Sequence, residues 1–494
     1  MNNKGHTTVL FSLIISILFL FTLTALEVGR IYMGKVKIRA VVHSTQSSIM
    51  ADYNSELFER YHLLFMDSTY ETGSEAALEE KVMDYLECSL NGEKNQGSGI
   101  YEFCIEEVSL ADKGGILDND MEQLKNQIAE YEKTAGIVHR AKKLAEKLEG
   151  KEEDIEGAAR ETEINGVKLT IEDNGDSSKD DTGNDLNMEV TDPRDTLQDA
   201  LKLGTLAFVL PEEHEFSKKK YDFREAPSVQ YTEKQEEKED NSFQDISFLQ
   251  NFLKRAAKEE AYTGIEKQAA FIDYAIDNFS NAAGQKNTSV MKCELEYILK
   301  GKSNDYDNLQ GVVDEMIWLR MPVNYVYLLS DAQKKSEALT LAAAICTATG
   351  AEAFIEVVKY LLLGCWAYGE TLCEMRTLLA GGKIAYIKTA ETWNTDLKGL
   401  NGGKSAQKTE NGLGYEDYLI ILLAKKGKKQ LNTCYARMLD IIELNLKEKD
   451  PDFSFKNCAG SLTIQGKISI NPLFIRGRNP EIYEICFEEE ISYQ

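Results

Sequence analysis

The chain has 494 residues, a formal net charge of −26 and an isoelectric point near 4.8. Proteins that bind nucleic acid need a basic surface to displace the counterions of the phosphates, so this composition argues against nucleic acid as a partner. The nine cysteines are scattered and include no C-x-x-C pair, which argues against a disulfide framework.

The first predicted element is an apolar helix at residues 9–26. Between Val9 and Leu26, with Leu18 near the middle, the sequence contains no charged residue, no Gly and no Pro. A helix of this length spans about 27 Å, and its large apolar side chains favour insertion into a bilayer by roughly 4 to 8 kcal/mol. We therefore expect a transmembrane helix, preceded by a short cytoplasmic tail at residues 1–8, with membrane lipid as a partner.

A cleaved secretory signal is the main alternative interpretation of this apolar run. The run exceeds the usual length of such a signal. Its best cleavage site, Leu23-Thr24-Ala25, lacks a small residue at the first position. The segment is therefore predicted to be retained as a membrane anchor.

Residues 27–67 are predicted to continue the same helix as a long amphipathic rod. Apolar residues recur there at steps of about 3.6 residues, and no Pro or Gly occurs from residue 35 to residue 67. Glu27 and Arg30 stand three residues apart on one helical face. They are expected to form an ion pair at the membrane boundary that contributes a few tenths of a kcal/mol.

The middle of the chain is predicted to contain three segments that differ in composition and structure. Residues 68–149 are expected to form a strand and helix region, with a helix at 76–91 and a strand at 101–110 that contains a bulge. Residues 150–195 are acidic and nearly free of aromatic residues, which predicts a disordered linker. A calcium-binding loop is the alternative there, but the EF-hand spacing is absent. Residues 196–243 are expected to be a loop-rich connection.

The C-terminal half is predicted to be a helical bundle followed by strands. Residues 244–450 have helical spacing, and recurring Glu and Lys residues leave no second uncharged run long enough to cross a membrane. Residues 451–494 alternate with period two, which predicts antiparallel strands. The expected fold class is α+β and predominantly helical. It comprises the transmembrane helix continuing into an amphipathic helix, a helical bundle, and a small antiparallel sheet that combines the 101–110 strand with the C-terminal strands.

Several segments of the chain also resemble a known family. They include "SLIISILFLFTLTALEVGR", "ADYNSELFERYHLLFMD", "FVLPEEHEFSKKKYDF" and "LLAGGKIAYIKTAETW". These resemble an uncharacterised family of bacterial membrane proteins whose genes accompany Tad (tight adherence, Flp) pilus clusters, akin to the TadE/TadG-like pseudopilins. The resemblance implies pilus or secretion-apparatus proteins as partners, and it brings no catalytic residues.

The resemblance also suggests prepilin-type cleavage after Gly5. In Tad pseudopilins a Glu stands five residues after the cleaved Gly, whereas here that position is Leu10 and Glu27 lies too deep to replace it. The sequence therefore favours an unprocessed N-terminus, with Gly5 as the candidate cleavage site.

The charges that flank the apolar run give conflicting indications of sidedness. Lys4 precedes it, whereas Arg30, Lys35, Lys37 and Arg39 follow it, and by the positive-inside rule this keeps the bulk of the chain in the cytoplasm. The resemblance implies export, which we prefer because pilin-like helices are directed by the short basic tail. The expected location is the cell membrane, single-pass, with the bulk of the chain extracytoplasmic.

The sequence carries no clear motif for catalysis, for a metal or for a cofactor. "GLNGGKS" at 399–405 has Lys398 where a phosphate-binding loop needs its first Gly, and the five histidines form no H-x-x-x-H pair. We expect no enzyme, no metal and no cofactor. The predicted function is that of a structural or assembly protein, a pseudopilin-like component of a Tad-type pilus or secretion apparatus. The alternatives are an exported membrane-tethered binding protein or envelope enzyme unrelated to pili, and a cytoplasm-facing scaffold.

Overall fold

The computed structural model describes nine stretches of the chain and a few single residues between them. The stretches are 4–70, 76–92, 101–135, 205–210, 216–233, 263–284, 289–397, 412–474 and 483–493. The predicted acidic linker at 150–195, with its calcium-loop alternative, lies outside the described residues. The chain divides into two compact units, and each is described by itself. Unit 1 comprises Met1–Tyr131 and Leu446–Gln494, and unit 2 comprises Glu132–Asn445.

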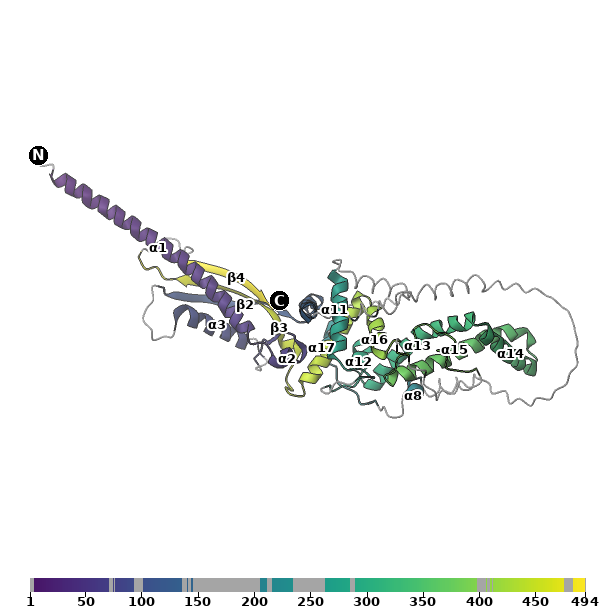
Figure 1. Cartoon of the computed structure of the whole chain (residues 1–494). Coiled ribbons are helices and arrows are strands. Elements are labelled where there is room, and N and C mark those ends of the chain that lie inside the picture. Colours follow the sequence, from purple (N-terminus) through teal and green to yellow (C-terminus); the bar gives the residue numbers. More distant parts are fainter. Residues whose placement is uncertain are drawn as a thin grey trace, which may run out of the picture. The chain divides into compact units, whose positions relative to one another are not determined.

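Helix α1 (Lys4–Met50) is the longest element of unit 1, and its two parts differ in environment (Figure 1). The side chains from Val9 to Leu26 are almost all exposed. The hydroxyls of Ser16 and Thr24 donate to backbone carbonyls one turn earlier, at 2.9 and 2.8 Å, so they need no partner outside the helix. From Glu27 onward one face of the helix is buried.

The predicted continuation of this helix to residue 67 is wrong, because α1 ends at Met50. A short helix, α2 (Ser55–Tyr61), and strand β1 (Met66–Asp67) follow it. The side chain of Asn54 accepts a hydrogen bond from the backbone N–H of Leu57 at 2.9 Å, which caps the start of α2. His62 ends α2 with a left-handed backbone at φ 55°. Apolar spacing alone conceals these local breaks, because the periodicity carries on through them.

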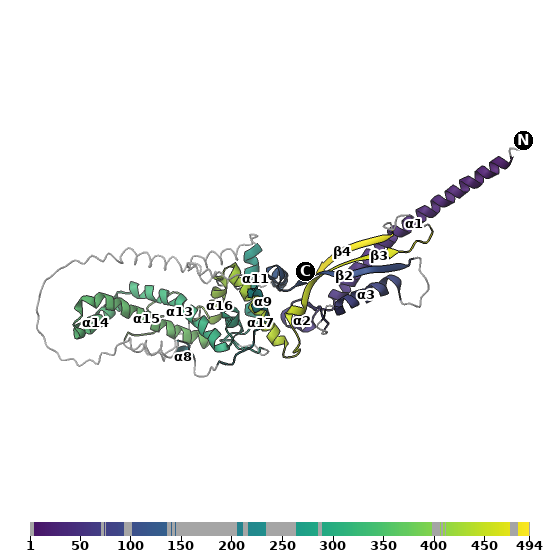
Figure 2. The same cartoon turned by 180° about the vertical axis from the view of Figure 1, so that it is seen from behind.

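A four-stranded antiparallel sheet confirms the predicted pairing of distant segments (Figure 2). Its strands besides β1 are β2 (Phe103–Gly115), β3 (Cys458–Ile470) and β4 (Glu484–Ser492). β3 is central and pairs with all three other strands. Phe103 lies opposite Ile470, and the register shifts after Ile105, where the sequence predicts a bulge.

The core of unit 1 lies between this sheet and two helices, α1 and α3 (Ala76–Asn91), where α3 matches its predicted bounds. The buried side chains come from all three layers. They are Ile38 and Val42 of α1, Leu78, Val82 and Leu86 of α3, and Ile464 and Ile468 of β3. Hydrophobic burial is the main stabilising term in such a core, so the second half of α1 is an integral part of the folded unit.

Unit 2 is helical, as predicted, and contains none of the four strands of the sheet. Its described helices are α8 (Thr205–Val209), α9 (Pro227–Glu233), α11 (Thr263–Asn278), α12 (Glu294–Lys300), α13 (Asp305–Ser330), α14 (Ala332–Thr349), α15 (Ile355–Leu379), α16 (Tyr415–Ala424) and α17 (Lys428–Leu446). Three glycines with positive φ lie at helix ends here: Gly301 after α12, Gly350 after α14 and Gly381 shortly after α15. Within the part of the chain that the structure describes, α1 is the one helix long and apolar enough to cross a membrane.

Changing Gly466 of β3 to Ala is expected to destabilise the sheet. A Cβ atom there would lie 2.7 Å from the backbone oxygen of Glu107 and 2.8 Å from Cζ of Phe487. Relieving such an overlap typically costs about 1–3 kcal/mol. The measurement is hydrogen exchange of the β3 amides in the full chain. Gly29→Ala is the control, because no atom lies within 4 Å of its Cβ, and equal exchange in the two variants would contradict the prediction.

Candidate functional site

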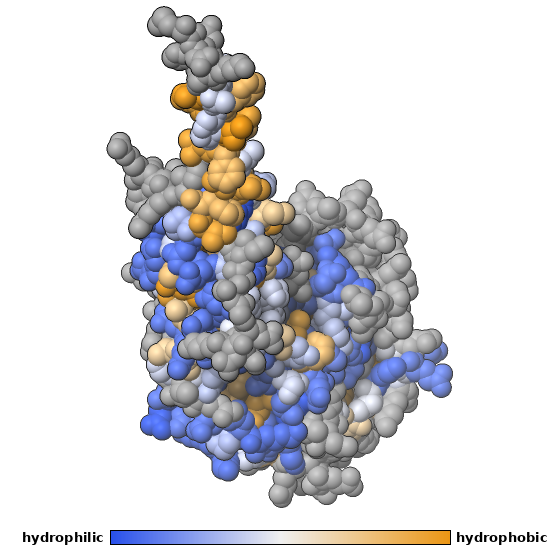
Figure 3. Space-filling view, turned by 90° about the vertical axis from the view of Figure 1, so that its left-hand side faces the viewer, coloured by the Kyte–Doolittle hydropathy of each residue, from blue (hydrophilic) through white to orange (hydrophobic). Residues whose placement is uncertain are grey.

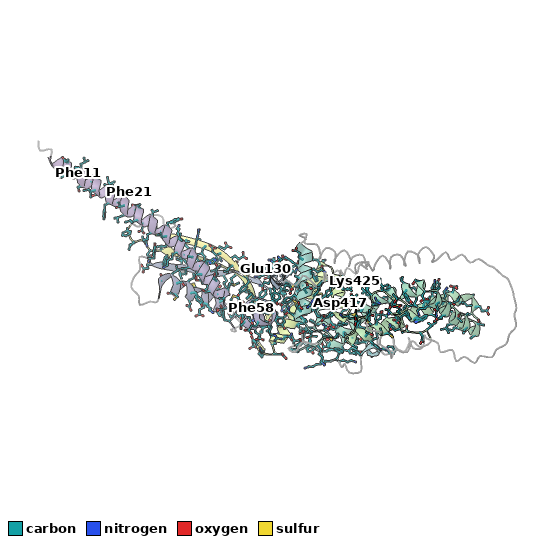
Figure 4. The ribbon with its side chains drawn as sticks, in the orientation of Figure 1. Phe11, Phe21, Phe58, Glu130, Asp417 and Lys425 are labelled. Carbon is teal, nitrogen blue, oxygen red and sulfur yellow. The ribbon has the colours of Figure 1, made fainter. Side chains whose placement is uncertain are left out.

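The strongest candidate site is the uncovered surface of α1. The exposed fractions of Val9, Leu18 and Leu26 are 66, 56 and 59%. The other large apolar side chains exposed there are Leu10, Phe11, Leu13, Ile14, Ile15, Ile17, Phe19, Leu20 and Phe21. Figure 3 shows them as a column of orange along the helix, and Figure 4 places Phe11 and Phe21 on the part of α1 that no other described element covers. A continuous apolar surface of this kind marks a contact with a membrane or with another protein.

The ion pair expected after the apolar run is present, but its environment differs from the one the sequence suggests. Arg30 Nη2 lies 2.6 Å from Glu27 Oε1, and each side chain is only 5% exposed. The segment that follows β3 covers the pair. Arg30 Nη2 also donates to the backbone oxygen of Asn471 at 2.6 Å. The carboxylate of Glu27 accepts hydrogen bonds from the backbone N–H groups of Leu473 and Phe474, each at 3.2 Å.

This burial raises the energetic importance of the pair. An exposed pair three residues apart on a helix contributes a few tenths of a kcal/mol. Removing one partner of a buried pair typically costs about 3–5 kcal/mol, because the other charge is left without compensation. The Glu27–Arg30 pair therefore fastens α1 to the segment after β3. Sequence reasoning missed Asn471, Leu473 and Phe474, for which the only signal is an apolar Leu-Phe pair after a predicted strand.

The basic residues that follow the apolar run have structural partners as well. Lys37 Nζ donates to the backbone oxygen of Leu90 at 3.2 Å and lies 5.0 Å from the ring centroid of Phe103. Arg30 is held in its ion pair. Two of the four cations thus take part in the fold of unit 1. Gly5, the candidate cleavage site, lies in the first turn of α1, and its processing stays a prediction.

Unit 2 contains a buried cluster of four charged side chains, which is the natural place to look for catalysis. Arg320 of α13 pairs with Glu374 of α15 at 2.6 Å. Lys388 lies 2.5 Å from Glu370 and 2.9 Å from Glu374. All four side chains are at most 2% exposed. In the sequence, Glu370 and Glu374 are two of the charged residues that interrupt the apolar stretch, but no spacing identifies Arg320 and Lys388 as their partners.

The hydrogen bonds of this buried charge cluster point to a structural role. Glu370 also accepts from the backbone N–H groups of Asn394 and Thr395, at 3.1 and 2.9 Å. Arg320 Nη1 donates to the backbone oxygen of Tyr386 at 2.6 Å. Two cations thus balance two anions, and the cluster holds the segment after α15 against the helices. The charged groups thus face one another in the interior, and none of the four side chains is more than 2% exposed.

A second buried acidic position lies on α12. Glu296 is fully buried, and its Oε1 accepts from the Tyr415 hydroxyl at 2.6 Å and from the backbone N–H of Ala282 at 2.9 Å. Among the residues that the structure describes, none forms a hydrogen bond with its Oε2. Burial raises the pKa of this carboxyl to about 7. Among the described residues, no group of three or more His, Cys, Asp or Glu side chains is arranged to hold a metal ion.

The chain was compared with known protein families, curated proteins and solved structures. A family model described as "Family of unknown function (DUF5702)" matches residues 183–470, which is more than half of the chain. No curated protein and no solved structure matches the chain.

The raised pKa of Glu296 predicts that unit 2 loses stability as the pH rises from about 4.5 to about 7. In this pH range the carboxyl group of Glu296 loses its proton more readily in the unfolded chain than in the folded chain. Between about pH 4.5 and pH 7, the free energy of unfolding should therefore fall by up to about 3 kcal/mol less in Glu296→Gln than in the native chain. The measurement is tryptophan fluorescence during denaturant unfolding, because Trp318, Trp366 and Trp393 all lie in unit 2.

Glu266→Gln is the matched control, because Glu266 is exposed on α11. It should leave the pH dependence as in the native chain. A Glu296→Gln profile identical to that of the control would contradict the assignment.

Proposed function

We propose that this chain, which belongs to the DUF5702 family of unknown function, is a single-pass membrane-anchored protein that acts through contacts with other proteins. One observation carries the proposal. The first part of α1 is apolar and uncovered, whereas the second part belongs to the core of unit 1. A helix built in this way holds a folded unit at a membrane without a flexible linker between them.

The finer role that we propose is that of a structural or assembly component of a Tad-type pilus or secretion apparatus, pseudopilin-like in character. Its support is the sequence resemblance, together with the packing of the second half of α1 against a small antiparallel sheet. Such a helix presents an exposed lateral face to neighbouring subunits. In this role the bulk of the chain lies outside the cytoplasm, and pilus or secretion-apparatus proteins are its partners.

A non-catalytic role fits the way in which the buried charges of unit 2 are paired. The charged side chains of the buried cluster satisfy one another and the backbone around them. Catalytic acids and bases must reach the substrate within hydrogen-bond distance. We therefore propose that the protein is not an enzyme and that unit 2 acts as a folded surface for contacts.

Replacing both Ile14 and Leu18 by Arg is expected to shift the protein from the membrane fraction to the soluble fraction. Each Arg near the centre of a span costs about 2.5–3.5 kcal/mol, so two of them cancel most of the roughly 4–8 kcal/mol that the apolar side chains contribute. The measurement is the distribution of the full chain between pellet and supernatant after carbonate extraction. The control is His43→Arg with Ser44→Arg, two exposed positions of α1 beyond the apolar run. If the Ile14/Leu18 variant stayed in the pellet like the control, α1 would not be the anchor.

Export of both units predicts that protease added to intact protoplasts degrades the chain, whereas a cytoplasmic marker survives. The pilus role further predicts that pilus or assembly proteins co-purify with the detergent-solubilised full chain and are lost with the Ile14/Leu18 variant. Protection of the chain until the protoplasts are lysed would favour the cytoplasm-facing scaffold. Export without any pilus component in the purified material would favour the tethered binding protein or envelope enzyme.

A further inference from the structure

We infer that the segment Asn471–Phe474 is a second membrane contact of unit 1, which presents Leu473 and Phe474 to the interfacial region of the bilayer beside α1. The inference rests on the proposed membrane anchoring by α1. It adds a contact outside the helix, contributed by a part of the chain more than 400 residues away from the anchor.

The position of the segment is fixed by hydrogen bonds to α1. Glu27 directly follows Leu26, the last residue of the apolar run. The backbone N–H groups of Leu473 and Phe474 both donate to the carboxylate of Glu27, at 3.2 Å. These two residues therefore lie at the level where α1 would leave the hydrocarbon region.

The side chains at this level are large, apolar and exposed. Leu473 is 56% exposed and Phe474 is 47% exposed, although unit 1 has a core that buries residues of the same kind. The neighbouring part of α1 also exposes apolar and aromatic side chains, namely Val28, Tyr32, Met33 and Val36. Tyr is enriched where membranes meet water, because its ring is apolar and its hydroxyl is polar. The apolar surface thus extends past Leu26 on both the helix and the adjacent segment.

The backbone of the segment is suited to lipid, because several of its polar groups are already bonded within unit 1. The N–H of Asn471 donates to the backbone oxygen of Glu102 at 3.1 Å, and its own oxygen accepts from Arg30 at 2.6 Å. The backbone N–H groups of Leu473 and Phe474 donate hydrogen bonds to the carboxylate of Glu27. Backbone groups that enter a bilayer must have such partners, since lipid tails offer none.

Lipid is the occupant that these observations favour. The exposed side chains continue the apolar surface of α1, and that surface is committed to lipid if α1 crosses the membrane. Apolar side chains inserted at the interface contribute to binding in proportion to the area they bury. A single helix leaves the tilt of the folded unit against the membrane surface free. A second contact beside the helix limits that tilt, and Glu27 and Arg30 act as positioning residues for it.

The test places a tryptophan at the proposed contact in the full chain. Phe474→Trp is reconstituted into nanodiscs, one chain per disc, with lipids brominated on the upper part of the acyl chain, which quench nearby indole rings. All three native tryptophans lie in unit 2 and provide the baseline. The matched control is Phe58→Trp, on α2 of unit 1, where the side chain is 37% exposed (Figure 4).

We expect the emission added by Phe474→Trp to be shifted to the blue and largely lost in brominated lipid, whereas the emission added by Phe58→Trp is retained. Adding Glu27→Ala to Phe474→Trp should restore most of the lost emission, because the segment is released from α1. Glu106→Gln, at an exposed carboxylate of the same unit, should leave the quenching as it is.

Three results would overturn the inference. Emission of Phe474→Trp equal to that in water, from protein that is firmly in the disc, would show that the segment faces solvent. A blue shift that appears only in discs with two chains and is insensitive to bromine would assign the segment to a second copy. Failure of the native chain to enter discs at all would overturn the membrane anchoring itself, and this result is distinguishable from the other two.

Discussion

The buried ion pair between Glu27 and Arg30 connects α1 to the segment that follows β3 in unit 1. It lies where the uncovered part of α1 meets the packed part, and it is almost completely buried. Its charges are compensated by each other and by backbone groups from the segment that follows β3. One pair of side chains therefore joins the N-terminal helix to a segment near the C-terminal end of the chain.

Unit 2 also contains buried charges that are compensated by opposite charges and by backbone groups. Arg320, Lys388, Glu370 and Glu374 neutralise one another in the interior, and backbone groups of the segment after α15 take up the remaining hydrogen-bonding capacity. A cluster of this kind makes one packing of that segment much more stable than others, since separating any partner leaves an unpaired buried charge. Both units thus contain buried charges that hold a neighbouring loop segment in place.

Several elements of the fold follow from local pattern. The long apolar helix, the helix at 76–91, the strand near 101–110 with its bulge, and the C-terminal strands were predictable, because apolar periodicity and turn residues act over a few neighbouring positions. The predicted rod to residue 67 failed for a reason that is also local. The Asn54 cap and the left-handed His62 interrupt the helix, while the apolar spacing continues across the break.

The sequence by itself determined that one uncharged helix of membrane length precedes an acidic, mostly helical chain, because hydropathy and charge are properties of the residues themselves. It also placed Glu27 and Arg30 within reach of each other. Only the tertiary structure decided that this pair is buried, that Leu473 and Phe474 lie beside it, and that Arg320 and Lys388 neutralise Glu370 and Glu374. These contacts join residues far apart in the chain, and no spacing along a single sequence encodes which of many charges will meet.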